Sequence, residues 1–192
     1  TAVVISAPDM TTEEQFAEIR DCGFNSVILS RAADRQLFHN HCKWLAQYEL
    51  KALWQDGSTY VYDSEDGSAT DGAAFIRIDP DNCFLNTDIT WGSMLRDEPN
   101  ASLFGTLKEA YDAYDALTED KVPYINLFPS YATNEQLGSP SYEDHVNTFL
   151  DTVRPAFTSV DIYPLNTGGS INGDYFYNLD VFSTACRTRG IP

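Results

Sequence analysis

Basic residues are scarce in this sequence: lysine and arginine together number 12, against 29 aspartates and glutamates, and the formal net charge is −17. A protein with so much negative charge repels phosphate groups, so we expect neither nucleic acid nor an anionic membrane as a partner. The sequence also lacks a signal-peptide pattern and any apolar run long enough to cross a membrane. Because the first residue is Thr1 rather than methionine, we expect a processed or excised piece.

Cysteine and histidine are too few and too scattered to indicate a metal site. None of the four cysteines stands in the CxxC spacing of a zinc site, and the four could form two disulfides or none. Cys22 and Cys42 lie in amphipathic helical patterns, where we predict buried thiols. The histidines also lie in helical patterns and are interpreted as surface or packing residues: His39, His41 and His145. We predict no metal and no cofactor.

Hydrophobic residues make up 43% of the 192 residues and aromatic residues 13%, enough for one domain with a sizeable core. Short apolar runs alternate with amphipathic helical patterns. The predicted strands cover 2–6, 25–30, 51–55, 91–95, 123–128 and 157–163. A long irregular loop, 57–88, interrupts this alternation. Its acid-rich part, 63–71, lacks the closing glutamate of a calcium-binding loop, so calcium binding there is left open.

Strand followed by helix, six times over, predicts a parallel sheet with right-handed crossovers. No glycine-rich phosphate loop follows the first strand, which argues against a nucleotide-binding sheet. Polar residues instead follow several strand ends, as in a (β/α)8 TIM barrel, whose active site lies at the carboxyl ends of its strands. We therefore predict an α/β fold over residues 1–192: a single-domain TIM barrel, incomplete because only about six of its eight βα units are present.

The segment 91–100, WGSMLRDEPN, combines an apolar strand pattern with a cluster of charged residues. Asp97 and Glu98 are adjacent carboxylates beside Arg96, and such neighbours push each other's pKa apart. Pro99 disfavours the helical conformation at Glu98, so the next helix should begin after the acidic pair. For an isolated Asp-Glu pair, we would favour a structural interpretation, in which the acids stabilise a helix N-terminus.

The same segment resembles the "GY-x-L-x-DEP" segment of TIM-barrel glycoside hydrolases, in the large clan that pairs an acid/base glutamate with a nucleophile. The resemblance continues through PYINLFPSY (123–131), SVDIYPL (159–165) and DYFYNLDVF (174–182), and it covers most of the chain except 57–88. It implies hydrolysis of an O-glycosidic bond in a poly- or oligosaccharide. It also implies a secreted protein, extracellular or periplasmic, with a carbohydrate as its substrate.

In that clan the general acid/base is the glutamate that ends the fourth strand, which corresponds to Glu98 here. Asp97 stands where the better-known members have asparagine. The resemblance places the nucleophile at the end of a seventh strand, beyond Pro192. An acid that works near neutrality needs a raised pKa, which Asp97 and apolar walls could supply to Glu98.

Substrate-binding residues are expected at the other strand ends and among the aromatic residues. Asp56, Asn126 and Asp161 follow or end predicted strands, so we expect them to converge with Glu98 at one end of the sheet. An equally weighted alternative is that Asn126 and Asp161 cap the loops behind their strands. Several aromatic side chains suit stacking against sugar rings: Tyr131, Tyr163, Trp54, Tyr60, Tyr62 and Trp91. For Trp91, packing in the core is the favoured alternative.

Two other functions remain open from the sequence. The chain could be a noncatalytic carbohydrate-binding or scaffold protein that lost the second carboxylate, or a structural assembly subunit. The first and sixth predicted strands, 2–6 and 157–163, carry apolar, β-branched residues without lysine or internal proline to discourage pairing. We therefore expect the missing barrel strands to come from further residues of the polypeptide or from another chain.

Overall fold

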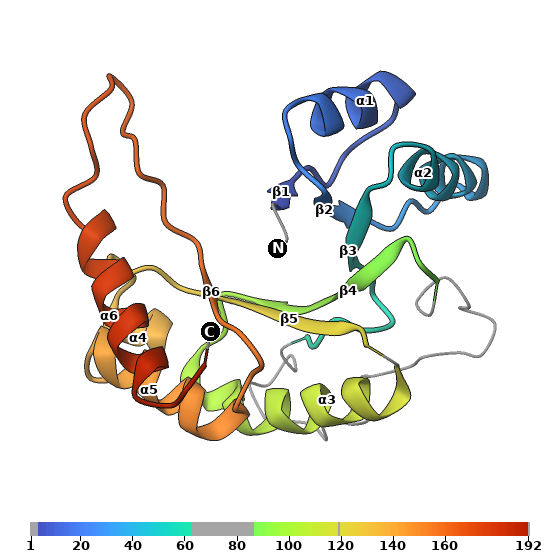
Figure 1. Cartoon of the computed structure of the whole chain (residues 1–192). Coiled ribbons are helices and arrows are strands. Elements are labelled where there is room, and N and C mark those ends of the chain that lie inside the picture. Colours follow the sequence, from blue (N-terminus) through green and yellow to red (C-terminus); the bar gives the residue numbers. More distant parts are fainter. Residues whose placement is uncertain (1–3, 63–86, 119, 192) are drawn as a thin grey trace. The chain divides into compact units, whose positions relative to one another are not determined.

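The computed structural model describes residues 4–62, 87–118 and 120–191. Six strands form one sheet in the order of the chain, β1-β2-β3-β4-β5-β6 (Figure 1), with parallel pairing. The strands are β1 Val4–Ser6, β2 Ser26–Ser30, β3 Lys51–Gln55, β4 Thr90–Asp97, β5 Val122–Leu127 and β6 Ser159–Val160. The helices are α1 Glu13–Asp21, α2 Arg35–Gln47, η3 Ala101–Leu103 (a 3-10 helix), α3 Phe104–Leu117, α4 Asn134–Leu137, α5 Tyr142–Val153 and α6 Tyr175–Arg187. This is the predicted α/β architecture of an incomplete TIM barrel.

The chain divides into two compact units. The first unit contains Thr1–Val61, Ala74–Leu95 and Asp112–Tyr124, and the second contains Tyr62–Ala73, Arg96–Tyr111 and Ile125–Pro192. Strands β4 and β5 therefore contribute to both units. Their carboxyl ends belong to the second unit, together with β6, α5 and α6.

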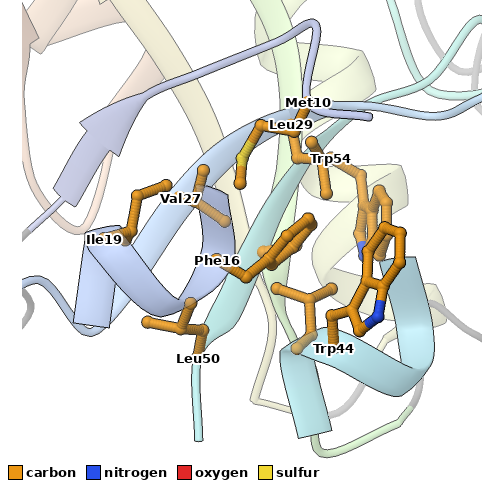
Figure 2. Close-up of a cluster of buried hydrophobic side chains, with 10 residues drawn as sticks. Met10, Phe16, Ile19, Val27, Leu29, Trp44, Leu50 and Trp54 are labelled. Carbon is orange, nitrogen blue, oxygen red and sulfur yellow. The ribbon is translucent and has the colours of Figure 1, made fainter. Parts of the chain in front are cut away.

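Apolar side chains from α1, α2 and the neighbouring strands form the core of the first unit (Figure 2). Phe16 is fully buried, and its ring centroid lies 5.4 Å from that of Trp44 and 5.6 Å from that of His41. Trp54 is also fully buried, and its ring nitrogen donates a hydrogen bond to Thr90 Oγ1 at 2.8 Å. The prediction that Trp54 is an exposed platform for a sugar ring is therefore wrong, because this indole is part of the core.

Glu13 joins the first two helices of this unit. Its carboxylate accepts hydrogen bonds from Gln47 Nε2 at 2.6 Å, from the Tyr48 hydroxyl at 3.0 Å and from Trp44 Nε1 at 3.1 Å. The bonds from Gln47 and Tyr48 are the main reasons why the pKa of Glu13 is lowered. One acidic side chain in the first turn of α1 thus fixes three side chains of the α2 region.

The cysteines differ from the prediction at one position. Cys22, just after α1, is exposed, so the buried thiol expected there is wrong: the side chain falls on the outer side of the last helical turn. Cys42 is partly buried and Cys186 is buried, and the Cys186 thiol lies 3.3 Å from Thr158 Oγ1. Cys83 and the acid-rich 63–71 segment lie outside the described residues.

The second unit is held together by α5 and α6. Arg189, just after α6, donates two hydrogen bonds to the Asp151 carboxylate of α5, at 2.7 and 2.8 Å, and the Tyr177 hydroxyl donates one to Glu143. On its other side α5 buries His145, whose ring centroid lies 5.0 Å from that of Phe104.

His145 is a buried histidine that must remain neutral in the fold. It is fully buried, and its Nδ1 lies 2.9 Å from the carbonyl oxygen of Leu137, so Nδ1 carries the proton and donates it to that oxygen. Its Nε2 is buried without a hydrogen-bond partner. Burial therefore lowers the pKa of His145 below the ordinary value of 6.5. The hydrogen bond to the Leu137 carbonyl oxygen raises the pKa, but by less than burial lowers it.

Acidification should destabilise the chain through this histidine. The unfolded chain takes up the proton near the ordinary value of 6.5 and the folded chain only at lower pH, so the stabilisation is present above 6.5 and is lost below it. In His145→Asn, whose amide nitrogen can replace Nδ1 as the donor, the fall in unfolding free energy between about pH 7 and about pH 5 should be smaller than in the wild type. Urea unfolding at the two pH values measures this. The exposed His39, changed to asparagine, is the control and should leave the fall unchanged.

Candidate functional site

Two carboxylates in the second unit follow the strands on either side of β5. Glu98 comes directly after β4, and its backbone nitrogen donates a hydrogen bond to the carbonyl oxygen of Asn126 at 2.9 Å. Asp161 comes directly after β6, and its backbone nitrogen donates to the carbonyl oxygen of Leu127 at 3.3 Å. Both bonds are made to the last two residues of β5, so the three strand ends align and bring Glu98 and Asp161 to the same edge.

A chain of hydrogen bonds crosses these three strands. Asn126, which is buried in β5, donates from Nδ2 to Asp97 Oδ1 at 3.0 Å and accepts at Oδ1 from the Ser159 hydroxyl at 2.8 Å. These contacts join Asn126 to the strand ends on either side of it, and both interpretations of Asn126 from the sequence, substrate binding and capping of the loop behind its strand, stay predictions. Ser159 was missed from the sequence. Its position two residues before Asp161, on the same side of a strand, was the available signal.

Glu98 adopts a strained backbone conformation. Its φ is +45°, in the left-handed region that residues other than glycine rarely occupy. Pro99 contributes to this, because a residue before proline is kept out of the helical region, but the extended region is the ordinary outcome. Strain of this kind costs of order 1–3 kcal/mol and persists only where the surrounding structure holds the residue in place.

The electrostatics of the site raise the pKa of two carboxyl groups, Glu98 and Asp161. The pKa of Glu98 is raised from its ordinary value of 4.5, first by burial and then by the negative charges of Asp97 and Asp161. The pKa of Asp161 is raised as well, first by burial and then by Asp97, while a hydrogen bond from the Tyr163 side chain acts in the opposite direction. Glu98 thus combines partial burial with two acidic neighbours, the environment of a tunable acid–base group.

Two exposed tyrosines accompany these acids. Tyr131, in the loop after β5, is 56% exposed, and Tyr163, after β6, is 65% exposed. The pKa of Tyr131 is raised by burial of its hydroxyl and then by the charges of Asp161 and Glu98, which places that hydroxyl in the field of the same carboxylates. A tyrosine whose pKa is raised keeps its proton at neutral pH and acts as a hydrogen-bond donor.

Asp56 has a different setting from the other predicted site residues. It lies in the first unit, is buried, and forms a salt bridge with Arg31 at 3.2 Å. Its Oδ1 also accepts a hydrogen bond from the backbone nitrogen of Ser58 at 2.7 Å. These contacts stabilise the turn after β3, and a role for Asp56 in substrate binding stays a prediction.

Asn100, the asparagine of a glycosylation sequon, is engaged in the fold. Its Nδ2 donates to the carbonyl oxygens of Glu135 and Gln136 at 2.9 and 3.0 Å, and its Oδ1 accepts from the backbone nitrogen of Ser102 at 3.0 Å. The side chain thus ties the segment after Glu98 to the end of α4. Its amide nitrogen already serves as a structural donor, which does not suit a glycan acceptor.

Among residues 4–62, 87–118 and 120–191, no group of three or more histidine, cysteine, aspartate or glutamate side chains is arranged to hold a metal ion. In the same described part of the chain, no helix is long and apolar enough to cross a membrane. Of the remaining predicted aromatic residues, Tyr62 is exposed and Tyr60 and Trp91 are partly buried.

Comparison with known proteins yields a fold but no family. No protein-family model matches the sequence, and no curated protein matches it. A solved structure that does match is the HpcH/HpaI aldolase from Desulfitobacterium hafniense DCB-2, with a TM-score of 0.54 and 10% sequence identity. The match covers 99% of this chain and 75% of that chain. An identity this low shows a common fold and nothing further.

This finding corrects the assignment made from the sequence. The structural neighbour is named an aldolase and no glycoside hydrolase family matches, so both the resemblance to glycoside hydrolases and the function of glycosidic-bond hydrolysis are wrong. Secretion, which rested on that resemblance, has no support from the comparison. The physical reason for the error is that a barrel of parallel strands places short acidic and aromatic motifs at its strand ends whatever reaction it performs. Segments such as DEP and DIYP therefore indicate the end of a barrel strand and do not identify a family.

Proposed function

We propose that this chain is an enzyme of the lyase type that cleaves or forms a carbon–carbon bond beside a carbonyl group, with Glu98 as its general acid–base. The observation that carries the proposal is the state of Glu98: a partly buried carboxyl of raised pKa, beside Asp161, on a left-handed backbone after β4. The fold neighbour is named an aldolase, which supports this reaction class over others that also use a carboxylate base.

A β-hydroxycarbonyl compound is the simplest substrate for this chemistry. The ionised Glu98 carboxylate accepts the proton of the substrate hydroxyl, the bond between the α and β carbons breaks, and an aldehyde or ketone leaves. The electron pair of the broken bond moves to the carbonyl oxygen of the other fragment, which becomes an enolate. Glu98 then returns its proton to the enolate carbon, so the cycle is balanced without a further reactant.

The enolate oxygen needs a hydrogen-bond donor, and Tyr131 is suited to this role. Burial and then the charges of Asp161 and Glu98 raise the pKa of Tyr131 above its ordinary value of 10, so its hydroxyl keeps its proton at neutral pH, as tyrosine ordinarily does. A donor that is placed before the reaction stabilises the negative charge as it develops on the oxygen. Asn126 donates a hydrogen bond to Asp97 and accepts one from Ser159, and these bonds hold the strand ends that carry the two acids.

The charge around Glu98 favours a neutral substrate. Asp97 and Asp161 already raise the pKa of Glu98 by repulsion, and a substrate carboxylate placed beside them would add another negative charge at short range. We therefore infer that the substrate carries its hydroxyl and carbonyl groups without a carboxylate beside the reacting carbons.

The test is cleavage of two neutral probes, diacetone alcohol and acetaldol, which split into acetone and acetaldehyde respectively. Proton NMR should show the product forming faster with the wild-type chain than with buffer or with Glu98→Gln, because only the wild type has the carboxylate base. Carboxylate-bearing β-hydroxycarbonyl compounds should be cleaved more slowly than the neutral probes. Equal product formation by wild type and Glu98→Gln across this panel would refute the proposal.

A further inference from the structure

A buried asparagine on α6 holds the loop that carries Tyr131. Asn178 is 0% exposed, its Oδ1 accepts a hydrogen bond from the backbone nitrogen of Ser130 at 2.9 Å, and its Nδ2 donates to the Ser130 hydroxyl at 2.8 Å. The same Nδ2 donates to the carbonyl oxygen of Asp174 at 2.7 Å. Both Nδ2 hydrogens and the Oδ1 atom are thus engaged, so the amide is satisfied in one orientation only.

Ser130, the residue that Asn178 binds, lies within a tight turn. The backbone nitrogen of Ala132 donates to the carbonyl oxygen of Pro129 at 3.1 Å, which makes Ser130 and Tyr131 the two central residues of the turn. Asn178 contacts the first central residue through both its backbone and its side chain. These bonds fix the direction in which the chain enters Tyr131, while Tyr131 itself remains exposed on the site edge.

Asparagine is a costly choice at this position for stability alone. It has poor helix propensity, and its buried amide must be fully hydrogen-bonded to avoid a desolvation penalty. The neighbouring buried positions of α6 instead hold apolar side chains, such as Phe182 and Ala185. A satisfied polar contact in a helix interior specifies one arrangement of the groups it joins.

We infer that Asn178 is a positioning residue, which holds the turn at Ser130 and thereby fixes the position of Tyr131 beside the strand ends that carry Glu98 and Asp161. The inference rests on the proposed function only for the catalytic role of the Tyr131 hydroxyl. The effect of Asn178 on the position of Tyr131 can be tested without any substrate.

The experiment is a pH titration of the full chain with carbon-13-labelled tyrosine, followed by NMR. The Tyr131 resonance is identified by its loss in Tyr131→Phe. In Asn178→Leu, which removes all three hydrogen bonds at similar volume, the pKa of Tyr131 should fall toward its ordinary value of 10, because the hydroxyl loses part of its burial and then the field of Asp161 and Glu98. Ser130→Ala removes only the hydroxyl contact, and it should shift the pKa in the same direction by less.

The matched control is Phe182→Leu, which disturbs α6 packing without touching the turn at Ser130 and should leave the Tyr131 pKa unchanged. The inference is overturned if Asn178→Leu and Ser130→Ala both leave the titration as in the wild type, or if Phe182→Leu shifts it as much as Asn178→Leu does. Ser130→Ala keeps the test decisive if Asn178→Leu does not fold. Because no carbonyl probe is used, failure here is distinct from failure of the proposed lyase activity.

Discussion

Replacing Glu98 with glutamine should lower the rate of aldol cleavage by about 10²- to 10⁴-fold, the usual contribution of a general acid–base group. Glutamine keeps the size of the side chain and its hydrogen-bonding oxygen, but it can neither accept nor return the substrate proton. Urea unfolding should show nearly the same stability as the wild type, so the loss of rate would reflect chemistry and not folding. Product formation from diacetone alcohol, measured by NMR under saturating substrate, gives the rate.

The pH dependence sharpens this prediction. Glu98 is active as the ionised base, so the wild-type rate should rise with pH through the pKa of Glu98, which burial and its two acidic neighbours raise above 4.5. In Glu98→Gln that rise should disappear together with most of the rate. Glu135→Gln, which changes an exposed glutamate of α4 in the same unit, is the matched control and should keep both rate and pH profile. A loss of less than about threefold in Glu98→Gln would show that another group is the base.

Local patterns were sufficient to locate the strands. Strand β3, Lys51–Gln55, begins and ends as predicted, because an apolar run between polar residues acts over short range. Strand β6 was predicted over 157–163 but pairs only at Ser159–Val160. Pairing requires a neighbouring strand, and β5 ends at Leu127, so β-propensity beyond that point finds no partner.

Short elements were harder to recognise. Helix α4, Asn134–Leu137, has only four residues, which carry too little periodicity to indicate a helix from the sequence. Its signal was present in Thr133 and Gln136, whose side chains bond each other's backbone nitrogen at 3.2 and 2.9 Å. A capping pattern should therefore outweigh the absence of an amphipathic repeat when the helix is a single turn.

The site itself was partly accessible from the sequence. Glu98, Asn126 and Asp161 could be expected at one edge, because parallel strands end on the same side. The left-handed backbone of Glu98 and the contacts of Asn178 depend on tertiary structure and could not be read from local patterns. The reaction class could not be predicted either, because carboxylates at strand ends serve many reactions on this fold.

Gly92→Ala should destabilise the first unit by about 3 kcal/mol or more, because a side chain at this position would overlap the backbone of the next strand. Gly92 lies in β4, opposite Leu53 of β3. A Cβ atom built there would approach the Val122 carbonyl oxygen most closely and would lie only 2.7 Å from the Val122 carbonyl carbon and 2.8 Å from its nitrogen. These are backbone atoms of β5, so no rotamer change can relieve the contact, and the strands must separate.

Gly105→Ala is the matched control for this prediction. Gly105 is exposed in α3, and a Cβ atom there would meet nothing within 4 Å. Alanine in a helix is more favourable than glycine by up to about 1 kcal/mol, so the same substitution should stabilise the chain slightly. Urea unfolding is followed by tryptophan fluorescence for the first unit, to which Trp44, Trp54 and Trp91 belong, and by circular dichroism for the helices of the second unit, which contains Gly105. If Gly92→Ala unfolds at the same urea concentration as the wild type, β4 and β5 do not approach as closely as this structure requires. The expected result is instead that Gly92→Ala unfolds at a much lower urea concentration than the wild type, while Gly105→Ala unfolds at a slightly higher one. In that case Gly92 is needed for the close approach of two strands and not for backbone freedom in general.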